Sequence, residues 1–223
     1  MSDAIVGVTG VSATGQTKLD YDFSVNWFSY AEKMWPDLVR FIPNEGKPRR
    51  FLEIGSFEGK SATWIIENMM QPGDTLLCVD TWKGGFEHAD INMAEVERRF
   101  DHNIAVALNK SGMDPRCIRK IKEDSVYALA YQMRWLPSPS HRFEFIYIDG
   151  SHQAPDVLTD AVMAWQLLAM GGIMIFDDYL WGDPRLPLQR PKFSIDAFMN
   201  IFGGEINVMH LGLQVVIKKA KLP

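Results

Sequence analysis

The chain has 223 residues, of which 47% are hydrophobic and 23% charged, and its glycine and proline usage is ordinary for a globular protein. This composition excludes a disordered or collagenous chain, and the length fits one large domain. The 23 basic and 28 acidic side chains leave a formal charge of −5, which argues against nucleic acid and anionic membranes as partners. Because no apolar run approaches the ~20 residues of a membrane span and the chain opens without a signal-peptide pattern, we expect a cytoplasmic protein.

The first 49 residues are predicted to form an N-terminal arm and short helices that could act as a lid on a main domain at residues 50–223. Residues 1–20 show no clear period. From Val25 to Ile42, apolar residues recur at helical spacing, and Pro36 is expected to break this stretch into two short helices. Residues 43–50 then form a linker.

Beyond Arg50, short apolar runs alternate with longer amphipathic ones. The short runs predict five strands, at residues 51–54, 75–79, 117–121, 143–148 and 172–176. The stretches between them have helical length and period, at residues 60–70, 93–109, 125–134 and 154–170, and Gly171 and Gly172 are expected to end the last helix. Nearly all-apolar strands separated by helices predict a parallel sheet covered on both faces.

After Asp178 the order of elements changes. A proline-rich loop leads to a short helix at residues 193–202, and two strands at 205–211 and 213–219 are joined so closely at Gly212 that they predict a hairpin. We therefore predict an α/β fold with a Rossmann-like, doubly wound, seven-stranded sheet, parallel except for one antiparallel strand in the C-terminal hairpin.

The junction after the first strand carries glycines that suit a ligand-binding loop. Gly55 and Gly59 let the backbone turn tightly, and the following helix offers unpaired N–H groups to an anion. The spacing lacks the third glycine of a dinucleotide-binding loop, and the first glycine of a P-loop is also missing. A plain glycine turn between strand and helix is the alternative.

Acidic residues follow the second and third strands as well. In an open α/β sheet a ligand lies beyond the carboxyl ends of the strands, where Asp80 could accept both hydroxyls of a ribose. Asp124 and Ser125 end the third strand and suit the edge of an adenine. Any one of these acids could instead be a helix cap or a solvated carboxylate.

With these motifs the chain resembles the class I S-adenosylmethionine-dependent methyltransferases. Residues 53–61, 148–152 and 176–179 look like those of small-molecule O-methyltransferases related to catechol O-methyltransferase and to sugar-modifying enzymes of antibiotic pathways. The resemblance implies a methyltransferase domain at residues 50–223, S-adenosylmethionine as the methyl donor, and O-methylation of a small-molecule acceptor.

The resemblance also implies roles for individual residues. Glu53, Gly55 and Ser61 would surround the methionine part of the donor, Asp80 would hold the ribose, and Asp124 and Ser125 would flank the adenine. Phe57 stands where the family often has a further glycine, which affects the local shape of the loop. The full set expected to contact the donor is Glu53, Gly55, Ser56, Phe57, Gly59, Ser61, Asp80, Thr81, Trp82, Asp124, Ser125 and Asp149.

Three carboxylates are predicted to converge at the ends of the fourth and fifth strands. Asp149 ends one strand and Asp177 and Asp178 end the next, and neighbouring parallel strands lie about 4.8 Å apart. Such crowding favours a divalent cation with oxygen ligands, Mg²⁺ or a similar ion. The alternative is that one or two of these acids cap helices or face water.

His152 lies three residues beyond Asp149 and is predicted to be catalytic together with it. It matches the position of the lysine base in catechol O-methyltransferase, and an imidazole could take a proton from an acceptor hydroxyl. A histidine hydrogen-bonded to the start of a helix is the alternative. The N-terminal helices and the stretch from Tyr179 to Pro191, which includes Trp181, are expected to contact the acceptor.

Two rival functions remain at this point. A metal-independent methyltransferase would keep Glu53 and Asp80 and leave Asp177 and Asp178 structural. A non-catalytic accessory protein would bind S-adenosylmethionine without turnover. The sequence leaves open whether the protein forms a homo-oligomer.

Overall fold

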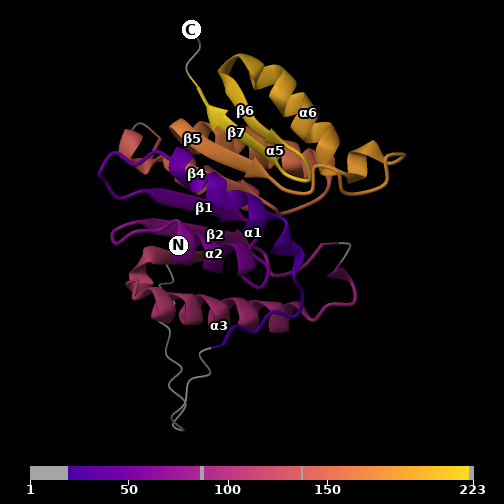
Figure 1. Cartoon of the computed structure of the whole chain (residues 1–223). Coiled ribbons are helices and arrows are strands. Elements are labelled where there is room, and N and C mark those ends of the chain that lie inside the picture. Colours follow the sequence, from indigo (N-terminus) through magenta and orange to yellow (C-terminus); the bar gives the residue numbers. More distant parts are fainter. Residues whose placement is uncertain (1–19, 86–87, 137, 221–223) are drawn as a thin grey trace.

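The computed structural model describes residues 20–85, 88–136 and 138–220, which build one seven-stranded sheet in the order β3-β2-β1-β4-β5-β7-β6 (Figure 1). β7 runs antiparallel to its neighbours β5 and β6, and the other pairings are parallel. The predicted sheet is thereby confirmed. The strands are β1 (Arg50–Ile54), β2 (Thr75–Asp80), β3 (Ile118–Lys122), β4 (Phe143–Ile148), β5 (Leu168–Phe176), β6 (Ile206–Leu211) and β7 (Val215–Lys219).

Helices cover both faces of this sheet, as the apolar strands require. Successive residues of a strand point to opposite faces, so Phe145 and Tyr147 of β4 belong to one hydrophobic cluster and Ile146 and Ile148 to the other. The first cluster is closed by α2 (Lys60–Asn68) and α3 (Met93–Ser111), and the second by α4 (Ser125–Met133), α5 (Ala154–Leu167) and α6 (Pro191–Phe202). No helix among the described residues is long and apolar enough to cross a membrane.

The segment before β1 is built of short turns of helix rather than the two helices expected. Its elements are η1 (Trp27–Ser29), α1 (Ala31–Met34), η2 (Trp35–Asp37) and η3 (Val39–Phe41). Pro36 lies in the first turn of η2, where its missing N–H is tolerated and a regular helix cannot continue through it. Residues 1–19 of the predicted arm lie outside the described residues.

The side chain of Trp35 fixes this segment to the sheet. It is fully buried, and its ring meets those of Phe145 and Tyr147 edge to face, at centroid distances of 5.5 and 4.9 Å. Its indole N–H donates to Gln214 Oε1 at 2.9 Å, which ties the segment to the chain just before β7. The N-terminal segment therefore shares the core of the main domain.

The end of α5 corrects one prediction. The helix was expected to run to residue 170 and to end at Gly171 and Gly172, but it ends at Leu167, and both glycines lie within β5. Leu168 is fully buried and pairs with Phe143, and the register then shifts before Ile173 pairs with Phe145. Burial of Leu168 between the layers overrides the helical period, and Gly171, at φ +76°, allows the irregular stretch. The other helices and strands beyond Arg50 differ from their predicted bounds by at most two residues.

Replacing Trp35 by alanine tests whether the N-terminal segment is part of the core. Loss of a fully buried tryptophan and of its hydrogen bond to Gln214 should lower the free energy of unfolding by about 3–5 kcal/mol, measured by urea denaturation. The matched control is Trp27→Ala, because Trp27 is 64% exposed, and it should cost less than about 1 kcal/mol. Equal losses in both variants would contradict this packing.

Candidate active site

A cleft of about 980 Å³ lies at the carboxyl ends of the parallel strands. It contains all the predicted donor-binding residues except Glu53, Gly59 and Trp82, which lie beneath its surface. The strands contribute to its lining as follows: Gly55, Ser56 and Phe57 after β1, Asp80 and Thr81 at the end of β2, Asp124 and Ser125 after β3, Asp149 to Gln153 after β4, and Asp177 and Asp178 after β5. The predicted residues are thus brought together at one edge of the sheet.

The loop after β1 follows a path that only glycine allows at Gly55. This residue has φ +84°, and a Cβ atom there would lie 1.8 Å from the backbone oxygen of Asp149. Phe57 and Trp82 also have positive φ, at 46° and 47°, which is strained for large side chains. Some interaction must therefore hold the loop in this shape.

That interaction is the carboxylate of Asp80. Its Oδ2 accepts hydrogen bonds from the backbone N–H groups of Ser56 and Phe57, both at 2.9 Å, and its Oδ1 accepts one from Trp82 N–H at 2.7 Å. The indole N–H of Trp82 in turn donates to the Phe57 carbonyl at 2.9 Å. The sequence pointed to Asp80 as a ribose ligand, but carried no signal for this second role of holding the glycine loop.

Glu53 lies below the loop and is fully buried. The Ser61 hydroxyl donates to its Oε1 at 2.5 Å, and its Oε2 has no hydrogen-bond partner among the described residues. Burial raises the pKa of Glu53 to about 7, and the hydroxyls of Ser56 and Ser61 oppose that rise. Gly59, at φ +80°, begins α2 beside the ring of Phe100, so it too supports the loop from beneath.

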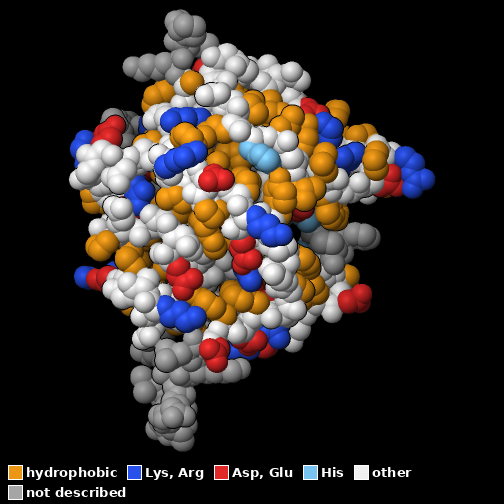
Figure 2. Space-filling view, viewed as in Figure 1, with side chains coloured by type: hydrophobic (Ala, Val, Ile, Leu, Met, Phe, Trp, Pro, Cys, Tyr) orange, Lys and Arg blue, Asp and Glu red, His pale blue; other side chains and the backbone are white. Residues whose placement is uncertain are grey.

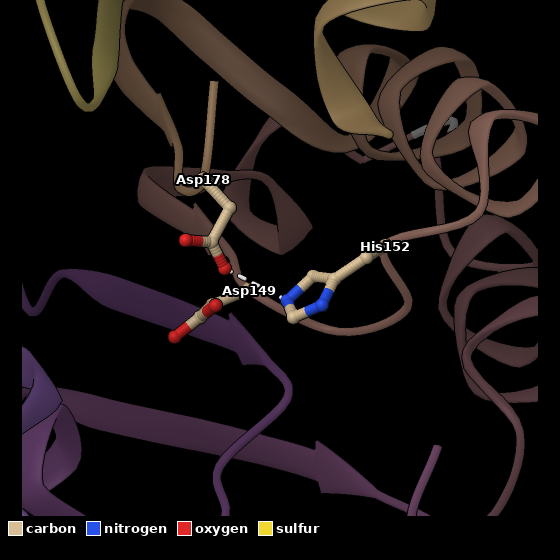
Figure 3. Close-up of side chains that lie close together, drawn as sticks. All are labelled: Asp149, His152 and Asp178. Atoms are coloured by element: carbon tan, nitrogen blue, oxygen red, sulfur yellow. Dashed lines mark ion pairs between the residues drawn. The ribbon is translucent and has the colours of Figure 1, made fainter. Parts of the chain in front are cut away.

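Asp149, His152 and Asp178 form a compact group on the cleft wall (Figure 3). One ligand atom from each side chain lies within 4.8 Å of the others, which is close enough for all three to hold one metal ion. His152 Nε2 and Asp178 Oδ2 form an ion pair at 2.7 Å, and Trp181 packs on the imidazole with ring centroids 4.3 Å apart. Asp178 has φ +55°, in the left-handed region that residues other than glycine seldom adopt.

Asp177 is engaged in a different set of contacts. Its Oδ2 accepts from the Tyr147 hydroxyl and from Gln214 Nε2, the latter at 2.8 Å, and its Oδ1 accepts from Asp178 N–H at 2.7 Å. The Tyr147 hydroxyl also lies 3.0 Å from Asp149 Oδ2. Burial and the neighbouring carboxylates raise the pKa values of both Asp149 and Asp177. Tyr147 and Gln214 were not predicted, because each looks like an ordinary residue of its strand or hairpin.

A larger cavity, of about 1340 Å³, opens at the opposite edge of the sheet and is lined by several arginines and lysines. Two of these cations donate hydrogen bonds to carbonyls in the last turn of α5. Arg142 donates to the Gln166 carbonyl, and Lys219 donates to the Trp165 carbonyl at 2.6 Å. Basic groups at the C-terminal end of a helix satisfy its last carbonyls. This cavity contains none of the predicted site residues, so the smaller cleft is the candidate active site.

Charged side chains of both signs are interspersed on the face of the molecule shown in Figure 2. The cleft itself is different. Its lining contains nine carboxylates and two lysines, Lys60 and Lys83. The site therefore presents an excess of negative charge.

An α/β sheet with a glycine loop and several acids at the carboxyl edge of its parallel strands is the architecture of a class of enzymes that bind a nucleoside-bearing cofactor there. Within this class, residues 52–179 match a family described as a methyltransferase domain. Because the match covers more than half of the chain, the protein belongs to this methyltransferase family. No curated protein sequence matches the chain.

Solved structures of methyltransferases share the fold. The O-methyltransferase TomG from Streptomyces achromogenes, determined with S-adenosylmethionine, is 19% identical, with 90% of this chain and 83% of that chain covered and a TM-score of 0.59. An O-methyltransferase from Bacillus cereus is 18% identical over 90% and 83% of the two chains, with a TM-score of 0.52. The mycinamycin-pathway enzyme MycE, determined with Mg, is 15% identical over 90% and 51%, with a TM-score of 0.54.

Replacing Asp80 by asparagine tests its hold on the glycine loop. The amide group cannot accept all three backbone hydrogen bonds, so the free energy of unfolding should fall by about 1.5–3 kcal/mol, the range for a bond to a charged group. Urea denaturation measures this loss. Asp101→Asn, on the exposed face of α3, is the matched control and should change stability little.

Replacing Glu53 by glutamine tests the raised pKa of the buried acid. Between pH 4.5 and about 7 the folded protein holds a proton on Glu53 that the unfolded chain has lost, so the stability due to this group falls as the pH rises through that window. The glutamine variant lacks this loss and should gain stability relative to the wild type, by on the order of 3 kcal/mol at high pH. Urea denaturation from about pH 5 to 8, with exposed Glu45→Gln as control, measures it. A constant difference between variant and wild type would contradict the assigned pKa.

Proposed function

We propose that the protein transfers the methyl group of S-adenosylmethionine to a hydroxyl oxygen of a small molecule, with a divalent cation at the carboxylates that follow β4 and β5. The observation that carries this proposal is the position of Asp149, His152 and Asp178 on the same cleft as the glycine loop and Asp80. The Streptomyces O-methyltransferase bound to S-adenosylmethionine and the Mg-bound MycE, which share the fold, support it.

The donor fits the part of the cleft nearest β1 to β3. Gly55, where a Cβ atom would collide with the Asp149 carbonyl, lets the loop after β1 pass beside the end of β4 and border the cleft, and we assign the methionine moiety to this loop. Backbone N–H groups take three of the roughly four lone-pair sites of the Asp80 carboxylate, and the remaining site, on Oδ1, can accept a ribose hydroxyl. We assign the adenine to the neighbourhood of Asp124 and Ser125, which follow the adjacent strand β3.

The acceptor belongs on the side of Asp149 and Asp178. Methyl transfer is an in-line displacement, so the protein must orient the acceptor oxygen toward the donor and take up its proton. His152 lines the cleft and is the group assigned to that proton. Because its Nε2 pairs with Asp178 Oδ2 at 2.7 Å, that pair must open, as it would when Asp178 turns to the cation, before the nitrogen can accept the proton. The ion pair with Asp178 favours this role over that of a simple helix cap.

The carboxylates of Asp149 and Asp178 fit Mg²⁺ or a similar ion, which prefers oxygen ligands. When bound, such an ion supplies Lewis acidity that favours the ionised form of an acceptor hydroxyl. Asp177 lies outside this group, and its Oδ2 accepts instead from Tyr147 and Gln214. If His152 is itself a ligand, the imidazole nitrogen suits transition metals better than Mg²⁺.

We further propose that the N-terminal segment and the Tyr179–Pro191 stretch border the acceptor. Phe23, Val25 and Trp27 line the cleft from the first, and Trp181 lines it from the second. Residues 20–49 act in this proposal as a fixed wall, because Trp35 anchors them to the core. Ser24, whose N–H donates to Glu58 Oε2 at 2.7 Å, holds the part ahead of Phe28 as well.

Chelation tests the metal against the rival, metal-independent reaction. With a panel of hydroxylated acceptors, product formation measured by mass spectrometry should stop in excess chelator and return with added Mg²⁺ or Mn²⁺, while S-adenosylhomocysteine binding by calorimetry stays nearly unchanged. Asp178→Asn should raise the Mg²⁺ concentration needed by at least roughly 10–100-fold. Asp101→Asn, on the surface of α3, is the matched control.

The outcomes separate the candidate functions. Full activity in chelator together with a wild-type response of Asp178→Asn would show a metal-independent enzyme. Binding of S-adenosylhomocysteine without product across the panel would indicate the accessory protein. Absence of any such binding by the folded protein would contradict the proposed donor.

A further inference from the structure

The cavity at the amino ends of the parallel strands carries an excess of positive charge, although the whole chain has a formal charge of −5. Seven of its lining residues are arginine or lysine, and two are glutamate. Ion pairs with nearby carboxylates cancel part of this charge. The paired residues are Lys47 with Glu45, Arg49 with Asp74 and Arg116 with Asp114.

Arg50, Arg142 and Lys219 differ from these, because their side chains donate to uncharged oxygens. Arg50 donates to the His141 carbonyl and, at 3.3 Å, to Gln132 Oε1. Arg142 and Lys219 donate to the last carbonyls of α5. A carbonyl or amide oxygen satisfies the hydrogen bond of a cation but leaves its charge in place. These three side chains therefore keep a positive charge that their hydrogen-bond partners do not cancel.

The same cations lie close enough to other cations to repel them. Burial and the charge of Arg142 lower the pKa of Lys219 to about 8. Burial also lowers the pKa of Arg50, and the charge of Arg119 adds to that effect. One carboxylate opposes each shift, Glu205 for Lys219 and Glu144 for Arg50. An anion placed among these side chains would relieve the repulsion in both pairs.

The positive charges extend along the edge of the sheet. Arg50 begins β1 and Lys219 ends β7, and β4 and β5 lie between these two strands. Three strand spacings therefore separate them, about 14 Å at the backbone. Arg142 directly precedes β4, so it lies between them. A single phosphate is too small to reach across this row, whereas a chain of linked phosphates can follow it.

Phosphate is the anion that these side chains suit best. The planar guanidinium group of arginine binds a phosphate through two parallel hydrogen bonds. The volume of about 1340 Å³ is sufficient for a molecule of nucleotide size. The candidate active site, with its nine carboxylates, would repel the same ligand. The two glutamates of the cavity and the net negative charge of the chain disfavour a long polyanion such as nucleic acid.

We infer that this cavity binds a small molecule with several linked phosphate groups, held by Arg50, Arg142 and Lys219. The cavity shares no lining residue with the candidate active site, so binding here does not depend on the proposed methyl transfer. The alternative is that these cations serve only to satisfy carbonyls, in which case the cavity has no affinity for phosphates.

Three anions test the ligand class by calorimetry on the full chain at constant ionic strength. Tripolyphosphate should bind at least about tenfold more tightly than inorganic phosphate, because it can contact several of the cations at once. Hexaglutamate, which carries carboxylates, should also bind at least about tenfold more weakly than tripolyphosphate. Tighter binding of hexaglutamate would assign the cavity to an acidic protein segment and overturn the inference.

Arg50→Gln and Arg142→Gln test the residues. Glutamine keeps an N–H₂ group that can donate to the carbonyl but removes the charge. Each variant should bind tripolyphosphate about 10–100-fold more weakly than the wild type. Arg116→Gln is the matched control from the same cavity and should weaken binding by about threefold or less, because Asp114 already pairs with Arg116. Thermal unfolding verifies that each variant is folded.

The other results would each contradict the inference. If the wild type binds no tripolyphosphate at millimolar concentrations, or binds it no better than inorganic phosphate, the cavity is not a site for linked phosphates. If folded Arg50→Gln and Arg142→Gln bind like the wild type, these arginines have only a structural role. If Arg116→Gln weakens binding as much as they do, the anion is attracted by the basic surface in general.

Discussion

The carboxylate of Asp80 is the group on which the geometry of the cleft depends. Three backbone N–H groups donate to it, from Ser56 and Phe57 after β1 and from Trp82 after β2. Two of these residues have left-handed backbones, each costing of order 1–3 kcal/mol. A hydrogen bond to a charged group contributes about 1.5–3 kcal/mol, so the carboxylate can offset that strain. The loop is thereby shaped before any ligand arrives.

The register of β4 and β5 brings together the acids that follow these two strands. Ile148 pairs with Phe176, so the residues that follow, Asp149 and Asp177, leave the sheet at the same level. Asp177 then joins Tyr147 and Gln214, while the left-handed turn at Asp178 accompanies its ion pair with His152. Since Gln214 also accepts from Trp35, the N-terminal segment supports this wall through a chain of hydrogen bonds.

Sequence patterns were sufficient where a short-range rule decides the outcome. Apolar strands alternating with helices predicted the sheet, and acids at strand ends predicted which residues meet at one edge. Patterns failed where long-range contacts decide: Leu168 becomes strand because it is buried beside β4, and nothing in the sequence indicated the contacts of Asp177 with Tyr147 and Gln214. Asp160, a buried acid of α5 that lines the cleft, was not predicted, because a single acid within a helix usually faces solvent.

The excess of carboxylates in the cleft bears on the proposed reaction as a whole. S-Adenosylmethionine carries a positive sulfonium that is lost on methyl transfer, so an acidic cleft favours the donor over the spent product. This difference assists capture of the donor and release of the product. It gives little help to the chemical step, because the same field also stabilises the donor before reaction. Rate must instead come from the acceptor side, where His152 can take the hydroxyl proton and the cation proposed at Asp149 and Asp178 would favour the ionised oxygen that attacks.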